Sequence, residues 1–324
     1  MPSDNDSHYS TETSHFPRLF GVSVSLALLI ACGGNGSQAN QRESTDSVPR
    51  VIATTSILGD VVGRIGADGI EMDVMIPPGV DPHDFSPSAQ QVAAISSADL
   101  IVANGLGLEE GLEDVLEQAE SEGIEVVRAG DEVDPLSASD ESEAADHEGH
   151  GFDPHFWQDP VRMKAAVAAI NRSLTDIGVE GASAGAAEYQ AALDAIHAEI
   201  VAILAPISPE RRLLVTNHDA FAYFADRYDF EVIGTIVPGG STLAEPSSSE
   251  IAALVATIVA NDVPAIFVEN IDDNGLAQVL AEETGRAIEV VQLVSDALGD
   301  PGSEMGSYDG MLLYNARAIA RALG

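Results

Sequence analysis

Apolar residues occur along the chain in short runs that alternate with longer amphipathic stretches, beginning near residue 51. The short runs are typical of buried strands, and the amphipathic stretches are typical of helices. Strands are predicted at 51–55, 71–76, 100–104 and 125–129, with amphipathic segments after 55, at 88–98 and at 108–122. This alternation predicts a lobe of the α/β class.

The alternation resumes after two helical segments, predicted at 160–177 and 184–204, of which the second is long and continuous. Further strands are predicted at 213–216, 231–236, 265–268 and 288–291, and further helices at 220–228, 248–260, 276–284 and 308–323. The pattern predicts two β/α lobes with central, mostly parallel sheets, joined by one long helix. We expect an N-terminal lobe at 50–183, a connecting helix at 184–205 and a C-terminal lobe at 206–324.

A different pattern precedes the first lobe. Residues 21–31 (GVSVSLALLIA) form an apolar run that is too short to span a bilayer as a helix but suits a secretory signal. The run ends in LIAC at 29–32, which resembles the lipobox of bacterial lipoproteins and implies that Cys32 is acylated. We therefore expect a lipoprotein signal peptide at 1–32 and a flexible linker at 33–49. An ordinary signal peptide with an incidental cysteine, or a buried Cys32, is the alternative.

The charge balance excludes one class of partner. The chain has 14 Lys and Arg residues against 53 Asp and Glu residues, giving a formal net charge of -39. Affinity for nucleic acid depends on Lys and Arg at the phosphates, so we expect no nucleic-acid partner. The acidic surface provides solubility, and its negative field either gathers cations near a site or has no further role.

Three histidines lie at junctions where open α/β sheets bind ligands. His83 follows a predicted strand in a proline-rich loop, His155 directly precedes a predicted helix, and His218 follows another predicted strand. Each alone is explained equally well as a turn or capping residue. Together they offer neutral imidazoles from separate segments, which zinc and neighbouring divalent ions bind well. Because Cys32 is the only cysteine, a metal in the lobes must be held by imidazole and carboxylate.

The segments around these histidines have a specific resemblance. DPHDF at 81–85, DPHFWQDP at 153–160 and NHDAFAYF at 217–224 resemble the histidine motifs of the zinc and manganese ABC-transporter solute-binding proteins, a lipoprotein family. The resemblance runs in order from about residue 51 to the C-terminus. It implies a metal site in the cleft between the lobes, with two histidines from the first lobe and the third from the second. It also implies a rigid connecting helix that limits lobe motion.

The family's fourth ligand is a late carboxylate, and the matching segment LVSDAL at 293–298 points to Asp296. Asp300, Glu304 and Glu269 are other acids within reach, so this ligand stays open. The resemblance further implies an ABC-transporter membrane permease and its ATPase subunit as partners, besides a divalent metal ion and the membrane at the lipid anchor. We expect an exported, lipid-anchored monomer that faces the periplasm or the cell exterior.

The donor set favours one metal over another. Three imidazoles and one carboxylate suit tetrahedral zinc, and divalent affinities at nitrogen-rich sites favour zinc over manganese. The resemblance adds that manganese members often carry Glu where His218 stands. We therefore expect Zn2+ as the transported ligand, with Mn2+ as the alternative. His147 and His150, in the acidic loop at 140–150, are candidates for an accessory low-affinity metal site, although a solvated loop explains them equally well.

Two other functions stay open from the sequence. A metal-dependent hydrolase would also need the metal, but the chain has no His-Glu-x-x-His stretch and no nucleophile elbow between a strand and a helix. We therefore expect no enzyme. A metal-binding surface adhesin of the same fold, with a role in cell adhesion, is the other alternative. His197, inside the long helix, is interpreted as a packing or surface residue.

Overall fold

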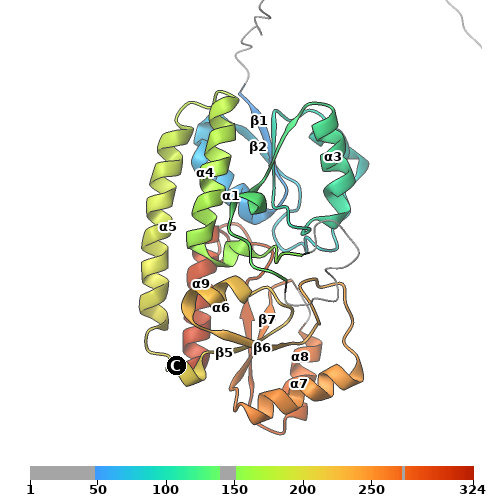
Figure 1. Ribbon diagram of the computed structural model, residues 1–324, viewed down its shortest axis with the longest axis vertical. Coiled ribbons are helices and arrows are strands. Elements are labelled where there is room, and N and C mark those ends of the chain that lie inside the picture. Colours follow the sequence, from blue (N-terminus) through green and yellow to red (C-terminus); the bar gives the residue numbers. More distant parts are fainter. Residues whose placement is uncertain (1–47, 139–150, 272–273) are drawn as a thin grey trace, which may run out of the picture. The chain divides into compact units, whose positions relative to one another are not determined.

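The short apolar runs form parallel strands, as the sequence predicts. The structure, a computed structural model, describes residues 48–138, 151–271 and 274–324, which lie within one unit of the chain at 47–324 (Figure 1). In the first lobe, the sheet order β2-β1-β3-β4 joins β1 (Arg50–Ala53), β2 (Glu71–Val74), β3 (Leu100–Ala103) and β4 (Glu125–Arg128). In the second lobe, β5 (Leu213–Thr216) pairs with β6 (Glu231–Thr235), and β7 (Ala265–Glu269) pairs with β8 (Glu289–Leu293). The predicted α/β class with parallel sheets is confirmed.

Helices alternate with these strands, and several begin at a capping side chain. They are α1 (Ser56–Gly66), α2 (Ala89–Ile95), α3 (Glu113–Ser121), α4 (Pro160–Asp176), α5 (Ala182–Leu204), α6 (Ala222–Tyr228), α7 (Ser248–Ala260), α8 (Gly275–Glu283) and α9 (Tyr308–Leu323). Ser88 and Ser247 start capping boxes at α2 and α7. Asp159 caps α4, and Pro160 occupies its first turn, where a proline needs no amide hydrogen. These helix starts are therefore encoded locally.

Helix α3 begins later than the sequence predicts, at Glu113 rather than near residue 108. Residues 105–107 form a turn with φ angles of 77°, 56° and 81°. The buried carboxylate of Glu109 accepts hydrogen bonds from the backbone N–H groups of Asn104, at 2.8 Å, and Gly105, at 3.1 Å. It also accepts a hydrogen bond from the Thr54 hydroxyl. Glu109 therefore stabilises the turn, and the helix starts beyond it.

Helix α5 connects the two lobes in the sequence and packs along both of them (Figure 1). It contacts α1 and α4, which precede it in the sequence, and α9, which follows it. Within the described part of the chain, no helix combines the length and the apolar character needed to cross a bilayer. The letters GASAG at 181–185 spell the hydrolase pattern Gly-x-Ser-x-Gly, but Ser183 is exposed in the first turn of α5 and follows α4 rather than a strand. It is therefore no nucleophile elbow.

Alternate residues of the strands face two different cores, because side chains along a strand point to opposite faces. One large core is shared by both lobes and includes Val51 of β1, Leu193 of α5 and Leu214 of β5. The opposite faces form separate cores, with Ile52 of β1 in the first lobe and Val215 of β5 in the second. The lobes are thus joined by a continuous apolar layer as well as by α5.

Candidate metal centre

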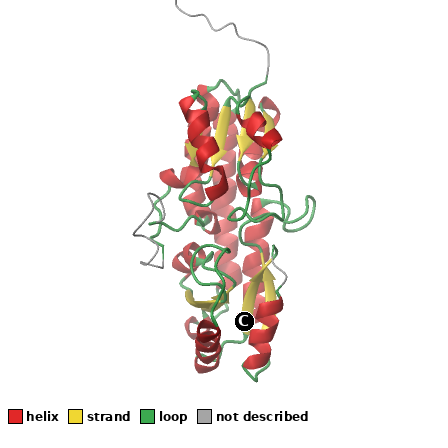
Figure 2. Cartoon of the chain, turned by 90° about the vertical axis from the view of Figure 1, so that its right-hand side faces the viewer, coloured by secondary structure: helices red, strands yellow, loops and turns green. Residues whose placement is uncertain are grey.

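Four side chains from separate segments meet between the two groups of strands. His83 lies in the loop after β2, and His155 directly precedes a short 3-10 turn, Phe156–Gln158, that leads into α4. His218 follows β5, and Asp296 follows β8. One nitrogen or oxygen atom of each side chain lies within 4.8 Å of those of the other three, and all four residues are buried. Loops lie in the region between the two groups of strands (Figure 2).

The spacing of these atoms fits a single small ion. His155 Nε2 lies 3.4 Å from His83 Nε2 and 3.2 Å from His218 Nε2. The Asp296 carboxylate lies 3.6 Å from His155 Nε2 and 3.3 Å from His218 Nε2. Two ligands of a tetrahedral zinc, each about 2.0–2.1 Å from the metal, are roughly 3.3–3.4 Å apart. The spacings around His155 and His218 are therefore close to those of a tetrahedral shell, and His83 completes the group within 4.8 Å of the others.

Asp296 has two buried carboxylate oxygens with no hydrogen-bond partner among the described residues. Burial without a partner is costly for a carboxylate, and it raises the pKa of Asp296 well above its usual range. The loop itself is firmly held, because the Asn315 side chain bonds the backbone N–H and C=O of Val294 at 2.8 and 2.7 Å. A divalent cation at this position would compensate the carboxylate that the loop holds in place.

The structure separates Asp296 from the other acids that the sequence left open. Glu269 is buried, but its carboxylate contacts the far ring nitrogen of His218 and is not among the four converging groups. Asp300 and Glu304 are exposed, and Glu304 pairs with Arg317 at 2.8 Å. Asp296 is therefore the acid that shares a centre with the imidazoles.

The two Asp-Pro-His segments fold in the same way. Asp81 Oδ1 accepts a hydrogen bond from the backbone N–H of His83 at 2.8 Å, and Asp153 Oδ1 accepts one from that of His155 at 2.9 Å. Asp153 Oδ1 also lies 2.7 Å from His155 Nδ1, which turns the Nε2 atom toward the centre. These positioning roles were not predicted from the sequence, although an aspartate two residues before each histidine was a visible signal.

Glu269 positions His218 in a similar way. Its carboxylate hydrogen-bonds His218 Nδ1, so that Nε2 faces the other ligands. Such partners fix the tautomer and orientation of a metal-binding imidazole. The sequence offered Glu269 as a reachable acid but not for this role. Its signal was a charged residue ending an otherwise apolar strand, Ala265–Glu269.

We expect Glu269→Gln to weaken the metal affinity of the deprotonated site about tenfold, after correction for proton competition at His218, since loss of such a partner typically costs 10- to 100-fold in affinity. Competition with a chelating indicator measures the change. Glu304→Gln is the matched control, because Glu304 is exposed and pairs with Arg317 away from the centre. An affinity equal to that of the unmodified protein would contradict the role given to Glu269.

The protonation states of the imidazoles differ. Burial lowers the pKa of His83 well below its usual range and lowers that of His155 to about 3, so both are neutral at physiological pH. Burial alone would also lower the pKa of His218, but the carboxylates of Glu269 and Asp296 outweigh it and raise this pKa to about 10. Without metal, the raised pKa values of His218 and Asp296 therefore favour protonation of these two ligands.

Other candidates from the sequence lie elsewhere. Cys32, His147 and His150 fall outside the described residues. His197 lies on α5 with its Nδ1 atom 3.3 Å from the hydroxyl of Tyr228, and it is not part of the cluster. The interpretation of His197 as a packing residue agrees with this contact.

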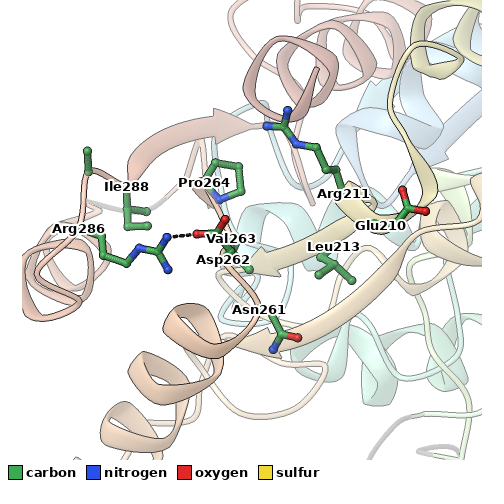
Figure 3. Close-up of a pocket in the computed structure, with 10 residues that line it drawn as sticks. Glu210, Arg211, Leu213, Asn261, Asp262, Val263, Pro264, Arg286 and Ile288 are labelled. Atoms are coloured by element: carbon green, nitrogen blue, oxygen red, sulfur yellow. Dashed lines mark ion pairs between the residues drawn. The ribbon is translucent and has the colours of Figure 1, made fainter.

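A separate cavity of about 630 Å³ lies at the start of the strands of the second lobe (Figure 3). It is lined by two basic residues, Arg211 and Arg286, and two acidic ones, Glu210 and Asp262. Arg286 forms an ion pair with Asp262. These charges balance and no histidine lines the cavity, so it lacks the imidazole donors that zinc binds well.

Comparisons with known proteins agree with this geometry. The family model described as zinc-uptake complex component A periplasmic matches residues 51–322. The zinc-binding protein TroA of Treponema pallidum (strain Nichols) is 33% identical over 306 residues, covering 92% of this chain and 96% of that protein. The manganese-binding lipoprotein MntA of Bacillus subtilis (strain 168) is 31% identical over 306 residues, covering 91% and 95%. The solved structure of the periplasmic zinc-binding protein TroA matches with a TM-score of 0.77 at 32% identity, covering 86% of this chain and 100% of that one.

Proposed function

Because the chain belongs to the family of periplasmic zinc-uptake complex component A, we propose that it is the extracytoplasmic solute-binding protein of an ABC importer. It captures Zn2+, with Mn2+ as the alternative, and delivers the ion to a membrane permease that works with an ATPase subunit. The proposed ligands are His83, His155, His218 and Asp296. The observation that carries the proposal is the buried convergence of these four groups, with one ligand atom of each within 4.8 Å of the others.

The donor set supports zinc as the first choice. The relatives divide between a zinc-binding protein at 33% identity and a manganese-binding lipoprotein at 31%, so identity does not separate the two metals. Imidazole nitrogen suits zinc better than manganese, which prefers carboxylate, carbonyl and water oxygens. Three nitrogens against a single carboxylate therefore favour zinc.

Metal analysis of the purified protein tests the function. We expect a single zinc ion per chain after loading with equal zinc and manganese, because zinc stands above manganese in the order of divalent affinities. Elemental analysis after dialysis gives the content, and titration of zinc into manganese-loaded protein gives the competition. A protein that takes up neither ion would overturn the proposal. One that keeps manganese against excess zinc would assign the site to Mn2+.

We also infer binding rather than catalysis. Catalytic zinc keeps an open position for water, whereas four protein ligands fill a tetrahedral shell. Neither carboxylate oxygen of Asp296 has a hydrogen-bond partner among the described residues, which supports a role as a ligand rather than as a general base beside a water. This supports a transport site over a hydrolase, and the buried position of the centre supports transport over an adhesin.

We propose that Cys32 carries a lipid anchor that keeps the protein on the outer side of the cytoplasmic membrane. We also propose that the protein is a monomer. Its lobes are proposed at 50–183 and 206–324, joined through 184–205. The apolar run at 21–31 before Cys32 supports the anchor. We expect Cys32→Ala to move the protein from the membrane fraction to the soluble fraction in cells. Cys32→Ala protein that stays with the membrane in high salt would contradict the anchor.

A further inference from the structure

The carboxylate of Asp81, two residues before His83, accepts two different hydrogen bonds. Asp81 Oδ1 accepts from the backbone N–H of His83, at 2.8 Å. Asp81 Oδ2 accepts from the Thr242 hydroxyl, at 2.6 Å. Asp81 lies in the loop after β2 in the first lobe, whereas Thr242 lies between β6 and α7 in the second. Asp81 therefore links the loop of one ligand to the opposite lobe.

The segment that carries Thr242 is itself tied to the His218 loop. The backbone N–H of Val237 donates to the carbonyl of Asn217 at 2.7 Å, and that of Asp219 donates to the carbonyl of Gly239 at 3.1 Å. The hydrogen bond between Asp81 and Thr242 consequently joins the segments that hold His83 and His218.

His83 is the least anchored of the four ligands. The exposed fraction of His83 is 6%, against 0% for His155, 0% for His218 and 1% for Asp296. The far ring nitrogens of His155 and His218 contact carboxylates, whereas the His83 ring makes its contact through Nε2, with His155. The position of His83 thus depends on its loop. That loop is held at its start, where the N–H of Gly79 donates to the carbonyl of Leu298 at 3.0 Å, and next at Asp81.

We propose that Asp81 and Thr242 form a latch that holds the His83 loop over the metal and slows release of the ion. This rests on the proposed function, because it needs a metal at the four ligands. Breaking the hydrogen bond lets the loop between Gly79 and His83 swing outward on its Gly79 link, which removes one imidazole while the other ligands stay in place. Asp81 and Thr242 are positioning residues that act through His83.

Thr242→Val tests the latch, because it removes the hydroxyl and keeps the shape and the charge of the centre. We expect zinc to leave Thr242→Val about tenfold faster, as a hydrogen bond to a carboxylate is worth about a factor of ten or more. Thr242→Ser keeps the hydroxyl and should restore slow release. Ser241→Ala is the matched control, since the Ser241 hydroxyl accepts from Leu243 N within its own loop, at 3.3 Å. Mixing zinc-loaded full-length protein with excess chelator in a stopped-flow instrument measures the release rate.

The outcomes separate the latch from the importer proposal. Release from Thr242→Val at the unmodified rate overturns the latch, and so does equally fast release from Thr242→Ser. Fast release from Thr242→Val with unmodified rates for Thr242→Ser and Ser241→Ala supports it. Thr242→Ala serves as a second variant if the valine disturbs folding, which the melting temperature of the metal-free protein reports. Failure of the unmodified protein to bind zinc or manganese overturns the proposed function instead.

Discussion

Replacing His218 with alanine is expected to weaken zinc binding at least roughly 100-fold. Protein zinc sites with four ligands are worth about 10–16 kcal/mol, or about 3 kcal/mol per ligand, and each 1.4 kcal/mol is a factor of ten. The loss is larger than at a surface site, because His218 is fully buried and its removal leaves Glu269 without its partner. Isothermal titration with a competing chelator measures the affinity.

His197→Ala is the matched control for this substitution. His197 is also a histidine of the second half of the chain, but it contacts Tyr228 from α5 and lies outside the cluster. We expect its affinity for zinc to be unchanged. Equal losses of zinc affinity in the two variants, or an unchanged zinc affinity in His218→Ala, would mean that the ion is bound elsewhere.

Zinc affinity is expected to rise at least about tenfold for each pH unit between pH 6 and pH 8, or at least roughly 100-fold in all. A metal needs the neutral imidazole of His218, whose pKa is raised to about 10 in the metal-free protein. Below that pH a proton must be displaced, so affinity falls as pH falls. His83 and His155 have lowered pKa values, the latter about 3, and are already neutral in this range. Among the three imidazoles, His218 is therefore the one that releases a proton, and the raised pKa of Asp296 can only steepen the slope.

Affinities measured at pH 6, 7 and 8 against a chelator of known protonation give the slope. Titration calorimetry in buffers of different ionisation heat counts the released protons directly. Glu269→Gln should flatten the slope, because Glu269 is the main attraction that keeps His218 protonated. A flat profile in the unmodified protein, or a slope of three protons, would show that the imidazoles titrate otherwise.

The fold was largely predictable from local patterns. Apolar runs bounded by turns gave the strands, and capping residues such as Ser88 and Ser247 mark where helices begin. The start of α3 was not predictable, because the buried hydrogen bonds of Glu109 to the turn at 104–105 arise only in the folded chain. A charged residue in an amphipathic segment gives no local sign that it points inward.

The site was partly predictable. The three histidines lie in motifs that the sequence displays, and the structure brings them together. The choice among Asp296, Glu269 and Asp300 could not be made from spacing, because loops after β7 and β8 reach the same region and only their three-dimensional course separates ligand from positioning residue. The link from Asp81 to Thr242 spans 161 positions and leaves no local trace.

The apolar layer that runs through both lobes has a consequence for how cargo can leave. Separating the two lobes would expose the core that includes Val51, Leu193 and Leu214. This exposure costs a free energy of about 25 cal/mol for each Å² of apolar surface. Moving a short proline-bounded loop exposes far less. We therefore expect the ion to leave by movement of this loop, while the apolar layer between the lobes stays intact.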